Sequence, residues 1–389
     1  MKIIFFTHPD FLGSQSMPRF AKMLAEGMEQ RGHSVEIWHP QPLFFKLSKK
    51  GSVNKWLGYI DQFIVFPAQV KRRLNKYNKE TLFVFTDHAL GPWVPLVKER
   101  PHVIHCHDFL AQLAALGKIK KSPTGFSGRL YQKFIRNGYT KGRNFISVSN
   151  KTRQDLTPFL VTEPQLNEFV YNGLNRSFVN LHPFEARIKF GDQTGLDLKQ
   201  GYILHIGGNQ WYKNRMGVIE IYDSWRDISN TTIPLLLIGK PAPPDLQRRK
   251  ESSKYNKDIF FLTDVMDEQL QLAYSGARLL LFPSLAEGFG WPIAEAMASG
   301  CPVVTTDAAP MTEVAADAAF LIRRMPEGKE NIYKWTIEAA HIVEQVVNLS
   351  PTSLEIVVKK GLINAQRFDT DDALDKIEKI YKEIMKLPC

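Results

Sequence analysis

Apolar and polar positions along the chain follow two alternating patterns. Near the start, the apolar run KIIFF at 2–6 is followed by a segment of helical periodicity at 18–32 and then by the run SVEIWH at 34–39. A short buried strand, an amphipathic helix and a second strand in this order form a β–α–β unit with parallel strands. Because the same alternation continues through the rest of the chain, the pattern predicts an α/β fold.

The apolar runs fall into two sets, and each set predicts one doubly wound sheet. Proline and glycine interrupt the pattern between the two sets, at 180–201. We expect a first Rossmann-like domain at 1–185, a second at 186–371, and a C-terminal helix at about 372–389 that packs back on the first domain. The later strands are expected at 82–87, 101–108 and 144–149 in the first domain and at 202–208, 233–240, 258–263, 277–284 and 301–307 in the second.

The place of the substrates follows from the expected fold. Ligands of open α/β sheets bind beyond the carboxyl ends of the strands. Two such domains would therefore hold their substrates in a cleft between them. Residues that directly follow strands are the candidates for function.

The composition is that of a folded globular protein, with 44% hydrophobic and 11% aromatic residues in a chain of 389. No apolar stretch approaches the roughly 18 residues of a membrane-spanning helix, and the apolar run in MKIIFFTHPD is too short for a signal peptide. We therefore expect a cytoplasmic protein. The three cysteines, Cys106, Cys301 and Cys389, lack paired spacing, which predicts reduced thiols rather than disulfides or a structural zinc site.

Positive charge is concentrated in the first half of the chain. Residues 1–180 hold 26 Lys and Arg against 12 Asp and Glu, whereas residues 181–389 hold 24 against 28. The excess clusters at 46–50, 71–79 and 117–121, between apolar and aromatic residues. Such a surface attracts anions, which gives two hypotheses: peripheral association with the inner face of an anionic cytoplasmic membrane, and nucleic-acid binding. The chain has no recognised nucleic-acid motif, so no nucleic acid is expected as a partner.

The stretch EGFGWPIAEAMASGCPVV begins at Glu287, shortly after the apolar run LLLFPS. Pro292 suits the first turn of a helix and Gly300 its end, so the pattern predicts a strand, a turn and a helix. The glycines of the turn let backbone N–H groups approach an anion or a sugar hydroxyl, and a carboxylate can accept both hydroxyls of a ribose diol. Taken singly, Glu287 and Glu295 could also merely favour the dipole of the helix N-terminus.

This stretch resembles the donor-binding signature of the family-four retaining glycosyltransferases of the GT-B fold, the glycosyl transferases group 1, with every defining position present. The resemblance implies two doubly wound Rossmann-like domains that face each other across a cleft. It implies transfer of a sugar from a nucleotide sugar with retention of configuration. It also implies that Glu295 binds the ribose diol and that Glu287, with the backbone of Gly288, Phe289 and Gly290, holds the donor sugar.

A second segment, YILHIGGNQWYKNR, resembles the same family. The resemblance places Lys213 where the family's lysine stabilises the leaving diphosphate. The family's usual arginine is missing, because Gly208, Asn209 and Tyr212 occupy its places, and Arg215 is expected to compensate. Gly208 and Asn209 are then candidate donor contacts. By itself, a lysine after a strand is most simply a solvated surface residue.

In HVIHCHDFLAQLAALG, His107 matches the family's histidine that reaches the donor sugar. The catalytic set that the resemblance implies is thus His107, Lys213 and Glu287. His105 is interpreted as a buried, hydrogen-bonded histidine. The run from His105 through Cys106 to His107 does not indicate a metal site, because alternate strand residues point in opposite directions and no third ligand has suitable spacing.

Two further matches are less specific. Thr263, Asp264 and Val265 lie in a loop that resembles the one whose backbone reads the nucleobase, and Gly13 matches a glycine near the donor phosphates or the acceptor. The run Asp-Thr-Asp at 369–371 spells the D-x-D metal-binding pattern of a different glycosyltransferase fold, but it sits at a helix start, where these residues are preferred caps. The resemblance implies a reaction that needs no metal, in agreement with the lack of a credible carboxylate cluster in the sequence, so no metal and no cofactor is expected.

The function that the resemblance implies is transfer of a sugar from a nucleotide-diphosphate sugar to a saccharide or lipid-linked acceptor, in cell-surface glycan biosynthesis. One alternative is a nucleotide-sugar epimerase of the same architecture, which would need no acceptor. Another, from a different class, is a basic nucleic-acid-binding protein. The sequence leaves open which sugar, which base and which acceptor hydroxyl are used.

Overall fold

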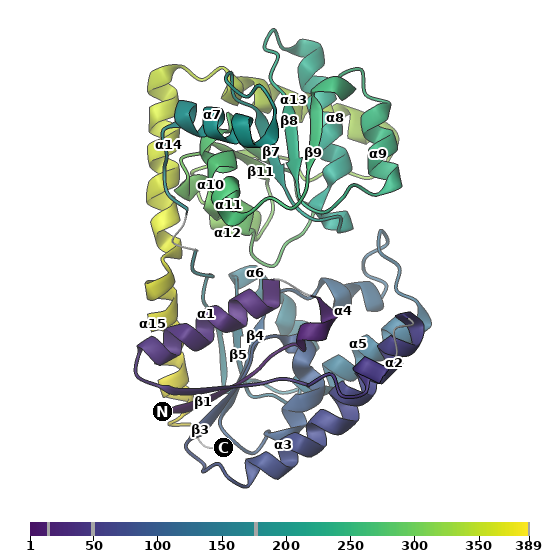
Figure 1. Ribbon diagram of the computed structural model, residues 1–389, viewed down its shortest axis with the longest axis vertical. Coiled ribbons are helices and arrows are strands. Elements are labelled where there is room, and N and C mark those ends of the chain that lie inside the picture. Colours follow the sequence, from purple (N-terminus) through teal and green to yellow (C-terminus); the bar gives the residue numbers. More distant parts are fainter. Residues whose placement is uncertain (14–15, 48–50, 175–177, 388–389) are drawn as a thin grey trace. The chain divides into compact units, whose positions relative to one another are not determined.

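The computed structural model describes residues 1–13, 16–47, 51–174 and 178–387 of the chain (Figure 1). Two compact units result: the first comprises Met1–Asn172 with Asp371–Cys389, and the second comprises Gly173–Thr370. Each unit contains one parallel six-stranded sheet with helices packed on it. The prediction of two doubly wound α/β sheets is confirmed.

The first sheet has the strand order β2-β1-β3-β4-β5-β6. Every residue of β3, β4 and β5 is buried, as expected for parallel strands that are covered by helices on both faces. The strands are β1 (Lys2–Phe6), β2 (Ser34–Trp38), β3 (Thr81–Phe85), β4 (His102–Cys106), β5 (Asn144–Ser147) and β6 (Leu166–Phe169).

Two apolar cores form on opposite faces of this sheet. One contains Phe5, Leu24 of α1 and Ile377 of α15, so the C-terminal helix packs in the first unit. The other contains Phe6 and Tyr139 of α5. The helices are α1 (Ser16–Gln30), α2 (Gly51–Ile60), α3 (Phe66–Leu74), α4 (Leu110–Ala115), α5 (Phe126–Tyr139), α6 (Asn150–Leu156) and α15 (Thr370–Ile384), and a π-helical turn, Asp61–Val65, joins α2 to α3.

The second sheet has the strand order β12-β11-β10-β7-β8-β9. Its strands are β7 (Ile203–Ile206), β8 (Leu235–Ile238), β9 (Ile259–Leu262), β10 (Leu279–Phe282), β11 (Val303–Thr306) and β12 (Phe320–Ile322). Its helices are α7 (Pro183–Thr194), α8 (Arg215–Ile228), α9 (Pro244–Glu251), α10 (Asp267–Gly276), α11 (Trp291–Ala298), α12 (Met311–Ala315), α13 (Lys329–Val347) and α14 (Pro351–Ala365).

The boundary drawn from the sequence at 185/186 is corrected, since it falls inside α7. The whole of this helix belongs to the second unit, which begins at Gly173. Arg187 Nε donates to the carbonyl of Gly276 at 2.8 Å, and Phe190 packs against Tyr202. These contacts bind α7 to the second sheet, and proline at its first turn is a helix start rather than a linker.

Both sheets have a switch point, where the chain reverses the direction in which it adds strands. In the first sheet the chain goes from β1 outward to β2 and returns to β3 on the other side of β1. In the second sheet it goes from β7 outward to β9 and returns to β10 on the other side of β7. Ligands of doubly wound folds bind at such points, beyond the carboxyl ends of the strands.

The structure can be compared with two expectations from the sequence, which concern membrane-spanning helices and the state of the cysteines. In the described ranges, no helix has both the length and the apolar character needed to cross a membrane. Cys106 and Cys301 are buried free thiols, and Cys389 lies outside the described residues. Burial raises the pKa of Cys106, so this thiol stays protonated.

Candidate active site

The signature stretch forms the junction between β10 and α11. Gly290 has a φ of 108°, a left-handed conformation that glycine adopts without steric cost, and α11 begins at the next residue. Pro292 lies in the first turn of α11, and Gly300, with a φ of 72°, follows its end. The predicted strand, turn and helix are confirmed. Glu287 therefore lies in the turn, and Glu295 lies in the second turn of the helix.

Glu287 is paired with Lys213 across the switch point of the second sheet. Lys213 Nζ lies 2.8 Å from Glu287 Oε1 and 2.9 Å from Oε2, and the two side chains are 16% and 8% exposed. Ser284 Oγ lies 2.6 Å from Glu287 Oε1 and fixes the carboxylate from the end of β10. The two residues come from the ends of neighbouring strands, β7 and β10, so this ion pair occupies the expected ligand position.

The backbone holds the segment that carries Lys213. The N–H of Leu285 donates to the carbonyl of Tyr212 at 2.7 Å, and Asn214 Nδ2 donates to the carbonyl of Pro283 at 3.0 Å. Asn214 is left-handed, with a φ of 53°, and ends this short segment before α8 begins at Arg215. The lysine is thus tied to the same turn that carries Glu287.

Glu295 is held by a tyrosine that the sequence interpretation missed. Tyr274 of α10 donates its hydroxyl to Glu295 Oε2 at 2.6 Å. Burial, with the nearby carboxylate, raises the pKa of Tyr274 well above its ordinary value, so the phenol remains a donor. A buried aromatic residue on a helix is typical of a core, and no local sequence signal distinguishes Tyr274 from one.

Arg215 and Asn209 contact each other. Arg215 Nη1 donates to Asn209 Oδ1 and, at 3.0 Å, to the carbonyl of Lys240, while Asn209 Nδ2 donates to Pro241. The guanidinium is buried, and its Nε and Nη2 have no hydrogen-bond partner among the described residues. Burial lowers the pKa of Arg215. Arg215 is therefore fixed beside the end of β8, with two donor groups that no described residue satisfies.

His205 of β7 is a second residue that the sequence interpretation missed. Its Nδ1 donates to the carbonyl of Leu281 at 2.9 Å, and its buried Nε2 has no partner in the described part of the chain. Burial lowers the pKa of His205 to about 3, so the ring is neutral. A polar residue inside the apolar run YILHIGG was the available sequence signal.

Glycines bring the ends of β7 and β8 together. A Cβ on Gly239 would lie 2.1 Å from the carbonyl oxygen of Gly207, so no other residue fits there without moving the backbone. Gly208 follows directly and is partly exposed. The ends of these two strands therefore approach each other more closely than residues with side chains would allow.

The candidate nucleobase contacts lie after β9. Thr263 and Asp264 are exposed, and Val265 is partly buried, in the loop that leads to α10. Asp264 has a φ of 55°, a left-handed conformation that aspartate tolerates better than most residues. The loop therefore lies at the carboxyl edge of the second sheet, directly after β9.

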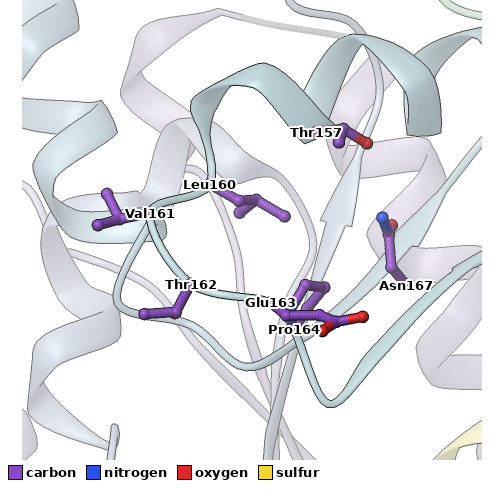
Figure 2. Close-up of a pocket in the computed structure, with 7 residues that line it drawn as sticks. All are labelled: Thr157, Leu160, Val161, Thr162, Glu163, Pro164 and Asn167. Atoms are coloured by element: carbon purple, nitrogen blue, oxygen red, sulfur yellow. The ribbon is translucent and has the colours of Figure 1, made fainter.

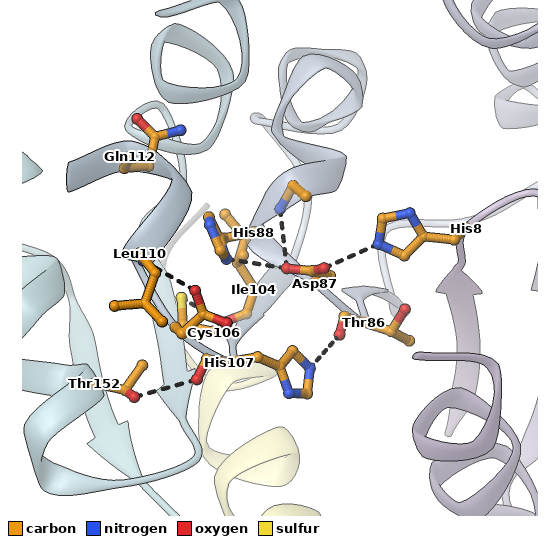
Figure 3. A network of polar contacts seen from close by, with 12 residues as sticks. His8, Thr86, Asp87, His88, Ile104, Cys106, His107, Leu110, Gln112 and Thr152 are labelled. Atoms are coloured by element: carbon orange, nitrogen blue, oxygen red, sulfur yellow. Dashed lines mark hydrogen bonds and ion pairs between the residues drawn. The ribbon is translucent and has the colours of Figure 1, made fainter. Parts of the chain in front are cut away.

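The first-unit candidates are Gly13 and His107. Gly13 is exposed and has a φ of 66° at the end of a short 3-10 helix. His107 directly follows β4, and its Nε2 donates to the carbonyl of Thr86 at 2.9 Å (Figure 3). Burial lowers the pKa of His107, so the ring is neutral and its Nδ1 carries the lone pair. The interpretation of His105 is confirmed, because its buried Nε2 lies 2.7 Å from Tyr381 Oη.

Next to His107, the structure brings together three residues that the sequence interpretation did not select. Asp87 lies between His8 and His88 in Figure 3. Asp87 Oδ2 is 2.9 Å from His8 Nε2, Asp87 Oδ1 is 3.0 Å from His88 Nδ1, and the N–H of Ala89 donates to Oδ1 at 3.1 Å. The three side chains follow β1 and β3, the strands at the switch point of the first sheet.

The hollow in Figure 2 lies away from all of these residues. It has a volume of about 510 Å³ and belongs to the first unit. It is formed by the loop that leads into β6, at the amino edge of the sheet, whereas ligands of such sheets bind at the carboxyl edge. Its lining residues are Thr157, Leu160, Val161, Thr162, Glu163, Pro164 and Asn167.

The structure groups the candidates by unit. In the second unit, Lys213 contacts Glu287, and Arg215 contacts Asn209. Gly13 and His107 belong to the first unit. Within the described residues, no group of three or more His, Cys, Asp or Glu side chains could hold a metal ion.

The two doubly wound units, with their switch-point residues, define a Rossmann-like class of protein that binds ligands at strand ends. Two family models identify it further: "Glycosyltransferase Family 4" matches residues 17–178 and "Glycosyl transferases group 1" matches residues 187–326. The chain belongs to this glycosyltransferase family and has its two-domain GT-B fold.

Curated relatives include two O-antigen enzymes. The chain is 32% identical to O-antigen chain mannosyltransferase B of Escherichia coli over 185 residues. This aligned stretch covers 47% of this chain and 46% of that protein. It is 24% identical over 304 residues to O-antigen chain mannosyltransferase RfbU of Salmonella typhimurium, covering 78% of this chain and 76% of that one. The chain thus spans less than half of the first relative and about three quarters of the second.

Solved structures share the fold. Sucrose-phosphate synthase from Thermosynechococcus elongatus has a TM-score of 0.74 at 15% identity, with 99% of both chains covered. HepE of Anabaena, solved in complex with UDP and glucose, has a TM-score of 0.71 at 18% identity, with 98% of this chain and 99% of that chain covered.

Proposed function

We propose that this glycosyltransferase moves a sugar from a nucleotide-diphosphate sugar to a saccharide or lipid-linked acceptor, with retention, in cell-surface glycan synthesis. The observation that carries the proposal is the Lys213–Glu287 ion pair on a glycine-lined turn at the switch point of the second sheet. The names of the O-antigen mannosyltransferases support a hexosyl donor and a glycan acceptor, and HepE is a neighbour that binds UDP and glucose.

In this proposal Lys213 stabilises the leaving diphosphate. Nζ donates to both carboxylate oxygens of Glu287 and also lies 5.3 Å from the centre of the Phe282 ring, so the ammonium has a fixed position beside an apolar wall. A diphosphate placed there would gain negative charge as the glycosidic bond breaks, and a positioned cation stabilises that charge. We propose that this charge compensation needs no metal, so turnover in EDTA should equal turnover without it.

Glu295 is proposed to bind the ribose. An ionised carboxylate offers about four acceptor sites, so Glu295 can bind the ribose diol beside its hydrogen bond from Tyr274. Glu287 and the backbone at Gly288, Phe289 and Gly290 are proposed to hold the donor sugar, with Gly208, Asn209 and Arg215 near the diphosphate. The loop at 263–265 is proposed to face the base, and Gly13 the phosphates or the acceptor. We propose a front-face reaction, in which the acceptor attacks from the side on which the diphosphate leaves.

The test is a panel of UDP-, GDP- and ADP-sugars in thermal-shift measurements. A ligand that binds only the folded protein raises the melting temperature, by an amount that grows with concentration over Kd. We expect one nucleotide class to stabilise the wild-type protein and to lose this effect in Glu295→Ala. If no nucleotide sugar stabilises the protein at millimolar concentration, the proposed function is wrong.

We further propose that the first unit binds the surface of an anionic membrane, where a lipid-linked acceptor would lie. Residues 37–79 and 109–154 contain 19 Lys and Arg but a single acidic residue, Asp61. Asp61 is 1% exposed and accepts hydrogen bonds from the N–H groups of Phe44 and Phe45, so it does not offset the surface charge.

The same segments expose large apolar side chains. α2 and α5 pack together through Tyr59 and Tyr131, whose rings are 5.7 Å apart. We propose that exposed residues of α2, α5 and the segments next to them form an apolar-basic surface that suits a headgroup layer, where apolar side chains insert and each nearby cation contributes about 1 kcal/mol. The surface consists of Val53, Lys55, Trp56, Ile64, Leu116, Lys118, Lys121, Phe126, Arg129, Leu130, Lys133 and Phe134, all of them exposed.

Vesicle sedimentation tests this surface. Vesicles with about one third anionic phospholipid should bind the wild-type protein at moderate salt, and the variant Trp56→Ser with Phe126→Ser should bind at least several-fold less. The matched control replaces two exposed apolar residues of the second unit, Tyr333→Ser with Ile356→Ser, and should bind like wild type. Binding that is independent of anionic lipid, or an equal loss in the control, would contradict the proposal.

A further inference from the structure

Two arginines lie against one glycine at the amino edge of the second sheet. Arg187 comes from α7, and Arg278 directly precedes β10. Gly201, which lies shortly before β7, has a φ of 86°, and a Cβ at this position would lie 2.8 Å from Arg278 Cγ and 3.1 Å from Arg187 Cζ. The bare glycine therefore leaves the space in which the two side chains approach each other.

The backbone fixes each of these side chains through a single nitrogen. Arg187 Nε donates to the carbonyl of Gly276 at 2.8 Å, where α10 ends beside α7 (Figure 1). Arg278 Nε donates to the carbonyl of Gln200 at 2.9 Å. A guanidinium has five N–H donors, and the structure gives the terminal nitrogens, Nη1 and Nη2, of neither arginine a hydrogen-bond partner among the described residues. Each arginine thus keeps its terminal donors available on an anchored side chain.

The two positive charges have no carboxylate partner in the described part of the chain. Neither guanidinium forms an ion pair there, although both side chains are partly buried. Burial lowers the pKa of Arg187, and the nearby positive charge of Arg278 lowers it further. Because like charges repel more strongly where water is partly excluded, an anion that contacts both guanidiniums would be favoured at this place.

A purely structural role explains only part of this arrangement. The last carbonyls of a helix carry about half a negative elementary charge, so an arginine at the end of α10 is favourable by itself. That interaction uses one N–H of Arg187, at Gly276. It leaves most of the two positive charges, and the terminal donors of both side chains, without a protein partner.

Charge and geometry select the class of anion. Two guanidiniums balance a dianion, whereas a carboxylate would leave one positive charge uncompensated. A phosphate monoester carries about 1.5 to 2 negative charges at neutral pH and offers three strong acceptor oxygens. The planar guanidinium matches phosphate oxygens through two parallel hydrogen bonds.

We propose that Arg187 and Arg278 form a binding site for a phosphate dianion, supplied as inorganic phosphate or as a small phosphomonoester. The site lies at the amino ends of β7 and β10, whereas Lys213 and Glu287 follow the carboxyl ends of the same strands. It is therefore separate from the proposed donor site, and the inference does not depend on the proposed function. A bound phosphate would join α7 to the segment that precedes β10.

Thermal melts in phosphate and in chloride at equal ionic strength test the site. Phosphate at millimolar concentration should raise the Tm of the wild-type protein, because a ligand of the folded state stabilises it. In Arg278→Gln the apparent Kd for phosphate should rise about tenfold or more, as expected for the loss of a charge-assisted hydrogen bond. Arg324→Gln, which changes an exposed arginine of the same unit, is the matched control and should keep the wild-type Kd.

Two further comparisons identify the site and the source of the phosphate group. Lys213→Ala should keep the phosphate-induced shift that Arg278→Gln loses, which separates this site from the donor site. Glycerol 3-phosphate replaces inorganic phosphate in the other comparison. A lower Kd for the ester assigns the site to a phosphomonoester, and an equal or higher Kd assigns it to free phosphate.

Other results overturn the inference. A structural role alone would lower the Tm of Arg278→Gln equally in chloride and in phosphate. A wild-type protein without a phosphate shift, a shift that persists in Arg278→Gln, or one that disappears in Lys213→Ala instead also contradicts the site. If Arg278→Gln does not fold, Arg187→Lys decides: lysine keeps the charge but loses the planar fork, so phosphate should bind several-fold more weakly.

Discussion

The two sheets carry different ion pairs at equivalent places. In the second sheet an ammonium and a carboxylate, Lys213 and Glu287, bridge the ends of β7 and β10. In the first sheet an imidazole and a carboxylate, His8 and Asp87, bridge the ends of β1 and β3. A lysine keeps its charge at neutral pH, whereas a histidine can gain and lose a proton there. The proposal that the second pair meets a charged diphosphate depends on this difference between the two kinds of cation.

The carboxylate of each ion pair is largely buried, so each pair needs both of its members. The Glu287 and Asp87 side chains are 8% and 12% exposed, so neither carboxylate is well solvated without its partners. Removal of one partner from a buried pair leaves an uncompensated charge. Variants that remove the partner thus affect stability as well as chemistry, and each prediction needs a stability measurement beside the kinetic one.

The largest effect is expected for Lys213→Ala. If Lys213 stabilises the leaving diphosphate, kcat should fall about 10²–10³-fold, since the charge it meets grows in the transition state. Steady-state kinetics with a thermal melt would check this, and Lys199→Ala, which changes an exposed loop lysine, is the control. A folded Lys213→Ala variant with the wild-type kcat would show that Lys213 does not stabilise the leaving diphosphate.

A smaller loss is expected at Glu295. A charge-assisted hydrogen bond contributes about 1.5–3 kcal/mol, so Glu295→Ala should weaken nucleotide-sugar use at least about tenfold. Tyr274→Phe removes only the hydroxyl that orients Glu295 and should raise the donor KM a few-fold with kcat nearly unchanged. Donor kinetics unchanged in Glu295→Ala would show that the carboxylate does not bind the ribose.

The smallest effect concerns stability against acid. Burial lowers the pKa values of His105 in the first unit and His205 in the second to about 3, so both rings are neutral in the folded protein. The unfolded chain binds a proton at each near pH 6.5, so stability is full above that pH and is lost as the pH falls toward 3. Each histidine should cost up to about 2 kcal/mol at pH 5.

Urea unfolding at pH 7 and pH 5 checks this expectation. His105→Gln and His205→Gln should each reduce the difference between the two midpoints. His88 acts in the opposite direction, because its raised pKa gives stability below pH 6.5 that is lost as the pH rises. An unchanged difference in both variants would show that neither histidine is titrated on unfolding.

Much of the second-unit site could be predicted because its parts are close in sequence. Glu287, Gly290, Pro292 and Glu295 lie in one strand–turn–helix segment, and local rules for turns and helix starts place them. Tyr274 could not be predicted, since its role depends on α10 lying beside α11.

The cluster at the strand ends of the first unit shows more clearly what could not be predicted from the sequence. His8 and Asp87 are 79 positions apart, and each follows a different apolar strand. Only the strand order, in which β3 returns beside β1, brings them together. The domain boundary was misplaced for a related reason, since the contacts of α7 with Gly276 and Tyr202 assign that helix to the second unit.

The sequence by itself determined the alternation of strands and helices, the parallel character of both sheets and the shape of the β10–α11 turn. These features depend on hydrophobic periodicity and on glycine and proline, which act over a few residues. The tertiary structure alone decided which strand ends are neighbours, and with them the pairs Lys213–Glu287 and His8–Asp87. Hydrophobic periodicity determines which face of a strand is buried. The strand order at the switch point determines which residues the carboxyl end of that strand contacts.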